Sequence, residues 1–368
     1  MVALAGAGCG KVKGIEAQHG ASADRAAKAG KQAAADAGPP VKLPPVNVAL
    51  LTMNKKDESS NRLLTQLMTV SKKPLGWVPQ PCDGKGTPKA LETCATGVID
   101  QGPLDFILSN GIDPKLMPRT LEKAAFKNIP VINIGSSVPP SPLLAADFAP
   151  DDRAQAKTLD RYMIRRLKRV PPASRRIAVL KSTGGGGRIR FEQLKEDIKG
   201  TGIQIVAEGK TDPEKADAAK DTVKGMLEKH DKLKAVWLAD GNSVDPAGKA
   251  VDKAFKDLKY PDRPLVLGFN ADPKAAGAIR DGKADAVADV PYDATLYIAL
   301  DRIAESIGRG EQLNPTSAKP YPLDFLDIAL VTRDNAPAKK KFREPKEDFV
   351  TFFLEKWKKE FGSPLTPG

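Results

Sequence analysis

Short apolar segments that alternate with amphipathic segments constrain this chain more than any other feature of its sequence. Ten segments of strand length lie between Val46 and Val331, and most of them end in a polar turn that precedes a segment of helical periodicity. Strands that alternate with helices form parallel sheets with right-handed crossovers. Because 368 residues exceed the usual size of one core, the sequence predicts an α/β protein with two doubly wound parallel-sheet lobes.

The predicted strands form two series. A proline-rich connection at residues 136–150 separates them and predicts a crossing from one lobe to the other. Strands are predicted at 46–52, 76–78, 104–108 and 129–134 in the first series, and at 176–180, 203–206, 235–238, 265–269, 286–290 and 325–331 in the second.

The two ends of the chain lie outside this pattern. Residues 1–9 resemble the end of a bacterial lipoprotein signal in which Cys9 would be lipidated, and a free cysteine in a flexible tail is the alternative. Residues 10–45 are rich in Ala, Lys, Gly and Asp, and this composition predicts that residues 1–45 form a disordered tether. Residues 338–368 are a predicted helical extension, whose aromatic side chains either cover one lobe or bind a partner.

Several function classes lack the residues that they require. The formal net charge is +12, but the lysines are scattered and accompany no zinc-finger or helix-turn-helix pattern, so we expect no nucleic acid partner. No run of 18 apolar residues is present that could span a membrane. The glycines at 184–187 match neither the Walker nor the dinucleotide pattern. The only histidines, His19 and His230, offer no nucleophile–histidine pair. We therefore expect no enzyme, no metal and no cofactor.

Cys82 and Cys94 are the only cysteines besides Cys9. Cys82 follows the second predicted strand, and Cys94 lies about two turns into the helix that begins near Thr87 and Pro88. The pair either forms a disulfide in an oxidising compartment or remains as two buried thiols.

Several segments, weak singly, resemble a known family when their order and spacing are considered together. These segments are 105–109, 127–133, 146–147, 267–270, 276–282 and 287–292. Over about residues 46–332 the chain resembles the type I periplasmic binding proteins, of the ribose and galactose receptor kind. The resemblance implies two lobes joined by three crossings, with a ligand enclosed between them by hinge closure.

The resemblance also implies domain boundaries and partners. Lobe 1 would comprise residues 46–147 and 290–323, and lobe 2 would comprise residues 148–289 and 324–337. The protein would be a monomeric, lipid-anchored, extracytoplasmic receptor that delivers a small polar ligand to the permease of an ABC importer. A receptor that reports its ligand to a membrane kinase or chemoreceptor is the alternative.

Polar residues after several predicted strands align with ligand-contacting positions of the family. Asp, Asn and Arg side chains can each bind two neighbouring hydroxyl groups in a desolvated cleft. The resemblance assigns ligand contacts to Asn54, Asp147, Arg188, Asp240, Asn270 and Asp289, and Phe148, Trp237 and Phe269 could supply a stacking surface. An enzyme that uses only the carboxylates of Asp240 and Asp289 is an alternative, because a hydroxyl-binding cleft requires the same residues.

Two departures from the sugar receptors leave the ligand class open. Gly135 and Ser136 stand where sugar receptors carry an Asp-Arg pair, and the polar residues 55–59 stand where they carry stacking aromatics. The cleft would then hold more acidic than basic groups. An amine or an amino sugar therefore competes with a neutral sugar or polyol as the predicted ligand.

Overall fold

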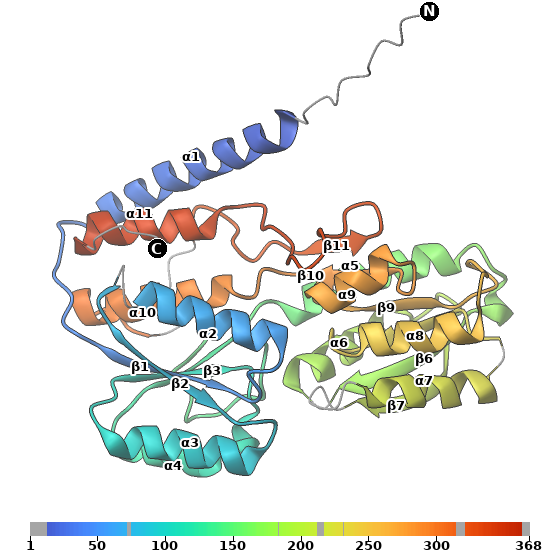
Figure 1. The fold of residues 1–368 in the computed structure, drawn as a ribbon, viewed down its shortest axis with the longest axis horizontal. Coiled ribbons are helices and arrows are strands. Elements are labelled where there is room, and N and C mark those ends of the chain that lie inside the picture. Colours follow the sequence, from blue (N-terminus) through green and yellow to red (C-terminus); the bar gives the residue numbers. More distant parts are fainter. Residues whose placement is uncertain are drawn as a thin grey trace, which may run out of the picture.

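The protein consists of two α/β lobes. The computed structural model describes residues 13–71, 75–182, 184–211, 217–230, 232–313 and 321–362. Figure 1 shows the lobes side by side, each with helices packed against both faces of a central sheet. The prediction of two doubly wound lobes is confirmed.

Lobe 1 contains a five-stranded parallel sheet. Its elements are β1 (Asn47–Thr52), α2 (Glu58–Val70), β2 (Val78–Asp83), α3 (Pro88–Gln101), β3 (Phe106–Asn110), η2 (Pro114–Leu116), α4 (Pro118–Phe126), β4 (Val131–Ile134), β5 (Ala146–Asp147) and α10 (Ala294–Arg309). The strand order is β2-β1-β3-β4-β5. Val48 and Leu50 of β1 pack toward α2 and α10, whereas Ala49 and Leu51 pack toward α3 and α4. Because both faces are buried, β1 is a continuous apolar run.

Lobe 2 repeats this arrangement and adds an antiparallel edge strand. Its elements are α5 (Asp152–Leu167), η3 (Pro172–Ser174), β6 (Arg176–Ser182), α6 (Gly185–Asp197), β7 (Gln204–Thr211), α7 (Ala218–Lys229), β8 (Ala235–Leu238), α8 (Val244–Ala254), β9 (Leu265–Phe269), α9 (Pro273–Arg280), β10 (Ala286–Asp289) and β11 (Ala329–Thr332). The strand order is β11-β10-β9-β8-β6-β7, with β11 antiparallel to β10. Val236 and Leu238 of β8 pack toward α7 and α8, and Ala235 and Trp237 pack toward α5 and α6.

Each of the ten predicted strands overlaps an observed strand. The largest shift is in β2, which was expected at 76–78 and lies at Val78–Asp83. Pro79 and Pro81 obscure this strand in the sequence, but β2 is an edge strand, where a proline nitrogen does not need to donate a hydrogen bond. The short β5 was not predicted because two residues carry no periodic signal.

The described elements place four crossings between the lobes. The three expected crossings are at residues 148–151, at residues 290–293 and between α10 and β11. After β11, residues 333–348 return to lobe 1 and lead into α11 (Phe349–Phe361), as Figure 1 shows. The fourth crossing arises because the C-terminal helix belongs to the core of the first lobe.

Helix α11 supplies aromatic side chains to the core of lobe 1. Phe352, Phe353 and Trp357 are fully buried there, together with residues of α10. The ring of Trp357 stacks on Tyr297 of α10, with 6.0 Å between the ring centroids. Of the two interpretations of the C-terminal extension, the structure therefore supports the one in which it covers a lobe.

The N-terminal segment forms a helix where the sequence predicted a disordered tether. Helix α1 (Lys13–Asp36) lies along α11, and the tether prediction is wrong for these residues. Small residues at four-residue spacing, Ala26, Gly30 and Ala34, form the buried stripe of α1. Composition alone hid this packing because the large apolar side chains of the interface come from the other end of the chain.

Gly30 allows α1 and α11 to approach closely. A Cβ atom at this position would lie only 2.3 Å from the carbonyl oxygen of Phe352. We expect Gly30→Ala to lower the free energy of unfolding by about 1–3 kcal/mol through overpacking, although alanine favours helix. Gly225→Ala is the matched control, because Gly225 lies in α7 with no atom within 4 Å of the added Cβ. The free energy of unfolding of this control, measured by chemical denaturation, should rise by up to about 1 kcal/mol. Equal gains in both variants would show that the two helices do not touch.

Candidate functional site

The strand order of each sheet defines one position where a ligand can bind. In the sheet of lobe 1, the direction of winding reverses between β1 and β3. In the sheet of lobe 2, it reverses between β6 and β8. Doubly wound folds bind ligands outside the carboxyl ends of the strands at this switch point. The candidate site therefore lies at the segments that follow these strands, at about residues 53–57, 111–113, 184–187 and 239–243.

The carboxyl ends of the two sheets face each other. A Cβ atom on Gly185 would lie 2.6 Å from the carbonyl oxygen of Ser137, and one on Gly186 would lie 2.6 Å from Ser136 Oγ. The first turn of α6 in lobe 2 thus packs against the segment after β4 in lobe 1. Close packing explains these glycines, against backbone atoms at Gly185 and against the side chains of Ser136 and Asp152 at Gly186.

A second contact between the lobes is electrostatic. Asp272, the N-cap of α9 in lobe 2, accepts hydrogen bonds from the backbone N–H groups of Lys274 and Ala275, each at 2.8 Å. The pKa of Asp272 is raised to about 7, mainly by burial and in smaller part by the negative charges of Asp57 and Glu58 at the start of α2. The segment after β1 in lobe 1 therefore lies near the segment after β9 in lobe 2.

Asp240 and Asn270 end neighbouring strands on the lobe 2 side of the site. Asp240 Oδ2 accepts a hydrogen bond from Thr211 Oγ1 at 2.7 Å, and Oδ1 accepts one from the backbone N–H of Ser243 at 2.9 Å. Asn270 is half-buried and has a φ of 60°, a left-handed conformation that asparagine adopts more readily than most residues. The Asp240 side chain is thus held by two hydrogen bonds, and Asn270 lies at the same edge of the sheet.

Arg190, which the sequence analysis did not select, is the buried arginine of α6. Its Nε donates to Asp152 Oδ1 at 2.8 Å, Nη2 donates to Gln155 Oε1 at 2.8 Å, and Nη1 donates to the carbonyl of Ala239 at 3.1 Å. Its guanidinium lies 4.4 Å from the centroid of the Phe269 ring. Arg190 thus joins α5, α6 and the end of β8 into one rigid rim.

Arg188 has the opposite environment. Its side chain is 57% exposed and pairs with Glu192 at 3.0 Å on the surface of α6. Helical periodicity could have separated the two arginines, because Arg190 shares its face with the buried Leu194, whereas Arg188 does not. Arg188 is free to reorient at the rim, and Arg190 is not.

The three aromatic candidates lie in the cores of the lobes. Trp237 has no exposed surface, and its Nε1 donates to Asp160 Oδ1 at 2.9 Å on the α5 side of the sheet. The prediction that Trp237 contacts a ligand is wrong, because its side chain points to a sheet face and not to the strand end. Phe148 is 9% exposed and packs in the core of lobe 1, and Phe269 is fully buried in lobe 2.

The three remaining candidates make local contacts. Asp289 Oδ1 accepts from the backbone N–H of Ala271 at 2.7 Å and Oδ2 accepts from Arg343 at 2.6 Å, so its carboxylate faces an arginine instead of an open site. Asp147 is exposed and accepts from Asn133 Nδ2 at 2.9 Å, between the adjacent strands β5 and β4. The side chain of Asn54 accepts from the backbone of Lys56 and shapes the turn after β1.

Comparison with known proteins identifies the family. A family model described as a periplasmic binding protein domain matches residues 83–308, which is more than half of the chain. The chain belongs to the periplasmic binding protein family. No curated protein matches it in sequence.

Solved structures share the fold of this periplasmic binding protein at low sequence identity. An ABC transporter solute binding protein from Mycobacterium smegmatis with bound glycerol is 19% identical, with a TM-score of 0.66 over 82% of this chain and 100% of that one. A periplasmic ribose ABC transporter protein from Conexibacter woesei is 17% identical, with a TM-score of 0.63 over 81% and 95%. A periplasmic sugar-binding protein from Pseudomonas fluorescens is 14% identical, with a TM-score of 0.67 over 80% and 88%.

Among the cysteines of this family member, Cys82 and Cys94 form a disulfide between the end of β2 and α3. Their Cα atoms are 5.8 Å apart, within the usual range for a disulfide. Cys9, the predicted lipidation site, lies outside the described residues.

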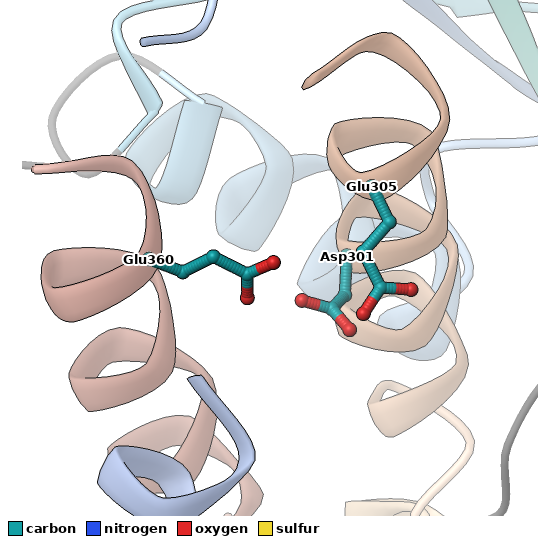
Figure 2. A group of neighbouring side chains, drawn as sticks. All are labelled: Asp301, Glu305 and Glu360. Carbon is teal, nitrogen blue, oxygen red and sulfur yellow. The ribbon is translucent and has the colours of Figure 1, made fainter. Parts of the chain in front are cut away.

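A buried group of three acids between α10 and α11 has the appearance of a metal site. Figure 2 shows Glu360 of α11 pointing toward Asp301 and Glu305 of α10. However, the ammonium group of Lys356 lies 2.7 Å from Asp301, 2.9 Å from Glu305 and 2.8 Å from Glu360. The protein therefore supplies its own cation, and the group serves to fasten α11 to α10. Burial alone would lower the pKa of Lys356, but these three acids outweigh burial and raise it.

Removal of the buried cation should destabilise lobe 1 severely. Lys356→Met keeps the length of the side chain but removes the one cation that all three buried carboxylates share, although Arg302 still pairs with Glu305 and Arg309 with Glu360. We expect a loss of about 3–5 kcal/mol in the free energy of unfolding. The loss should shrink at acidic pH, where the carboxylates become protonated. Lys358→Met, at an exposed position of the same helix, is the control and should stay within about 0.5 kcal/mol of the parent protein. A small effect of Lys356→Met would contradict the fastening role.

The pKa of Asp272 predicts a pH dependence that reports on lobe proximity. Because the folded-state pKa of about 7 lies above the usual value of 3.8, the free energy of unfolding should fall as pH rises from about 4 to 7. Asp272→Asn keeps a capping oxygen and should remove this fall. Asp57→Asn should shift the fall to lower pH, because it removes one negative charge that faces Asp272. Urea unfolding at a series of pH values measures both effects. If the fall in Asp57→Asn has the same pH midpoint as in the parent protein, Asp57 and Asp272 do not interact and the lobes lie farther apart than in this structure.

Proposed function

We propose that this protein is an extracytoplasmic solute-binding receptor of an ABC importer that encloses a small polar ligand between its lobes. The observation that carries the proposal is that the carboxyl ends of the two sheets, one in each lobe of a periplasmic binding protein fold, face each other. A ligand that contacts both rims binds the closed arrangement more tightly than the open one, and this difference in affinity stabilises the closed arrangement.

The ligand would be a sugar, a polyol or a related hydroxyl compound. Asp240 and Asn270 would offer polar groups from the lobe 2 rim, and Asn54 would offer another from the turn after β1 in lobe 1. Arg188 would leave Glu192 and donate to the ligand on closure, since its side chain is largely exposed. The structures of similar fold bear names that state ribose transport, sugar binding or bound glycerol, which supports the same ligand class.

A ligand that carries an amine is the second candidate. Asp57 and Glu58 of lobe 1 act electrostatically on Asp272 of lobe 2, whose pKa is raised mainly by burial and in addition by these two charges. A cationic group between them would relieve this repulsion. An amino sugar or a small amine therefore fits the electrostatics of the site better than a neutral sugar fits them.

The cellular arrangement is part of the same proposal. Within the described ranges, no helix has both the length and the apolar character needed to cross a bilayer. We infer that Cys9 carries a lipid, that the receptor acts as a monomer outside the cytoplasm, and that it delivers its ligand to a membrane permease. Helix α1 would then hold lobe 1, rather than lobe 2, close to the anchor.

Thermal-shift screening against sugars, polyols, amino sugars and small amines tests the function. A ligand at 100 times its Kd should stabilise the protein by about 2.7 kcal/mol. For the ligand found, we expect Arg188→Ala to weaken binding by about 10-fold to 100-fold in calorimetry, because a charge-assisted hydrogen bond is lost. Lys195→Ala, at an exposed position of the same helix, should bind as the parent does. Equal affinities of the two variants would remove Arg188 from the site, and the absence of any stabilising ligand would contradict the proposed ligand classes.

A further inference from the structure

The fourth crossing makes contacts with both lobes along its length. In lobe 2, the carbonyl oxygen of Pro337 accepts a hydrogen bond from Arg280 of α9. In lobe 1, the ring of Phe342 lies 4.4 Å from the guanidinium of Arg62 in α2. Near its end, Glu347 pairs with Arg25 of α1 at 2.5 Å. Residues 333–348 are therefore bound to both halves of the molecule and are not a loose linker.

Arg343 is the central contact of this segment. Its Nε donates to Asp289 Oδ2 at 2.6 Å, and its Nη1 donates to Asp327 Oδ2 at 3.0 Å. Its Nη2 also donates to the backbone carbonyl of Asp327 at 3.0 Å. A guanidinium can serve these acceptors together because its donors form a planar fork, which a lysine ammonium lacks.

The two acids that Arg343 binds lie at different crossings, one at the start of the second and one within the third. Asp289 is the last residue of β10, directly before the second crossing, and Asp327 lies in the third crossing, just before β11. Arg343 itself lies in the fourth. One side chain thus connects the polypeptide segments at three of the four crossings.

The ion pairs of Arg343 are shielded from water. The side chains of Arg343 and Asp289 are 13% and 9% exposed, and that of Asp327 is 15% exposed. Pairs of this kind cost much more to break than surface pairs, since a buried charge would be left without a partner. The pairs therefore resist any motion that separates the crossings.

A hinge opens by rotation within its connecting segments, and the segments must shift relative to one another as the lobes separate. We propose that Arg343 is a positioning residue of the hinge, which limits the opening of the lobes by joining the second, third and fourth crossings. Phe342 extends the connection to lobe 1, because Arg62 beneath its ring pairs with Asp293 at the start of α10. The C-terminal extension thereby acts on lobe geometry in addition to covering lobe 1.

The distance between two spin labels tests this role without any ligand, so its outcome is independent of the identity of the solute. The labels would be placed at Lys89→Cys in α3 and Lys229→Cys in α7, which are exposed positions in opposite lobes. Cys9→Ser removes the remaining thiol outside the Cys82–Cys94 disulfide. Pulsed electron paramagnetic resonance then gives the distribution of distances between the lobes for the full-length protein.

We expect Arg343→Ala to broaden this distribution and Arg343→Lys to restore it in part, because lysine keeps the charge but not the fork. Asp327→Asn breaks one of the two ion pairs and should broaden the distribution to a smaller extent, which keeps the test valid if Arg343→Ala does not fold. Lys339→Ala, at an exposed position of the same crossing, is the matched control for loss of one positive charge. Folded Arg343 and Asp327 variants with the distance distribution of the parent would overturn the proposal.

Discussion

Burial of both faces of two parallel sheets is the constraint on which the remaining structure depends. Helical layers cover each face, so strand side chains on either face are buried in the core, as Leu50, Leu51, Val236 and Trp237 are. Polar groups are then confined to the strand ends. Since the carboxyl ends of both sheets face one another, the polar groups of the two lobes converge on one region, and the site follows from the packing.

The two ends of the chain modify this plan by adding a second helical layer to lobe 1. Helix α11 contributes a large aromatic surface, and α1 covers it with small side chains that allow close approach of the two backbones. The buried Lys356 fastens the layer to α10 through three acids. To reach this position the chain has to cross between the lobes once more, which brings Arg343 to the hinge.

Sequence reasoning succeeded where the signal was local and failed where the partner was distant. The strands and lobes followed from apolar runs and polar turns, which each segment carries in itself. Trp237 was misassigned because its neighbour Asp160 lies 77 residues away, and α1 was missed because its partner is the opposite end of the chain. Arg188 was selected over Arg190, although helical spacing placed only Arg190 on the buried face of α6.

The sequence by itself determined the α/β class, the division into two lobes and the location of polar residues at strand ends, because periodicity and turn chemistry act over a few residues. The tertiary structure alone decided which of those residues remain available to contact a ligand. Asp289 is engaged by Arg343, Trp237 is enclosed in a core, and Asp272 meets the acids of the other lobe. These outcomes depend on burial and on charges brought together from separate parts of the chain, and no local pattern encodes them.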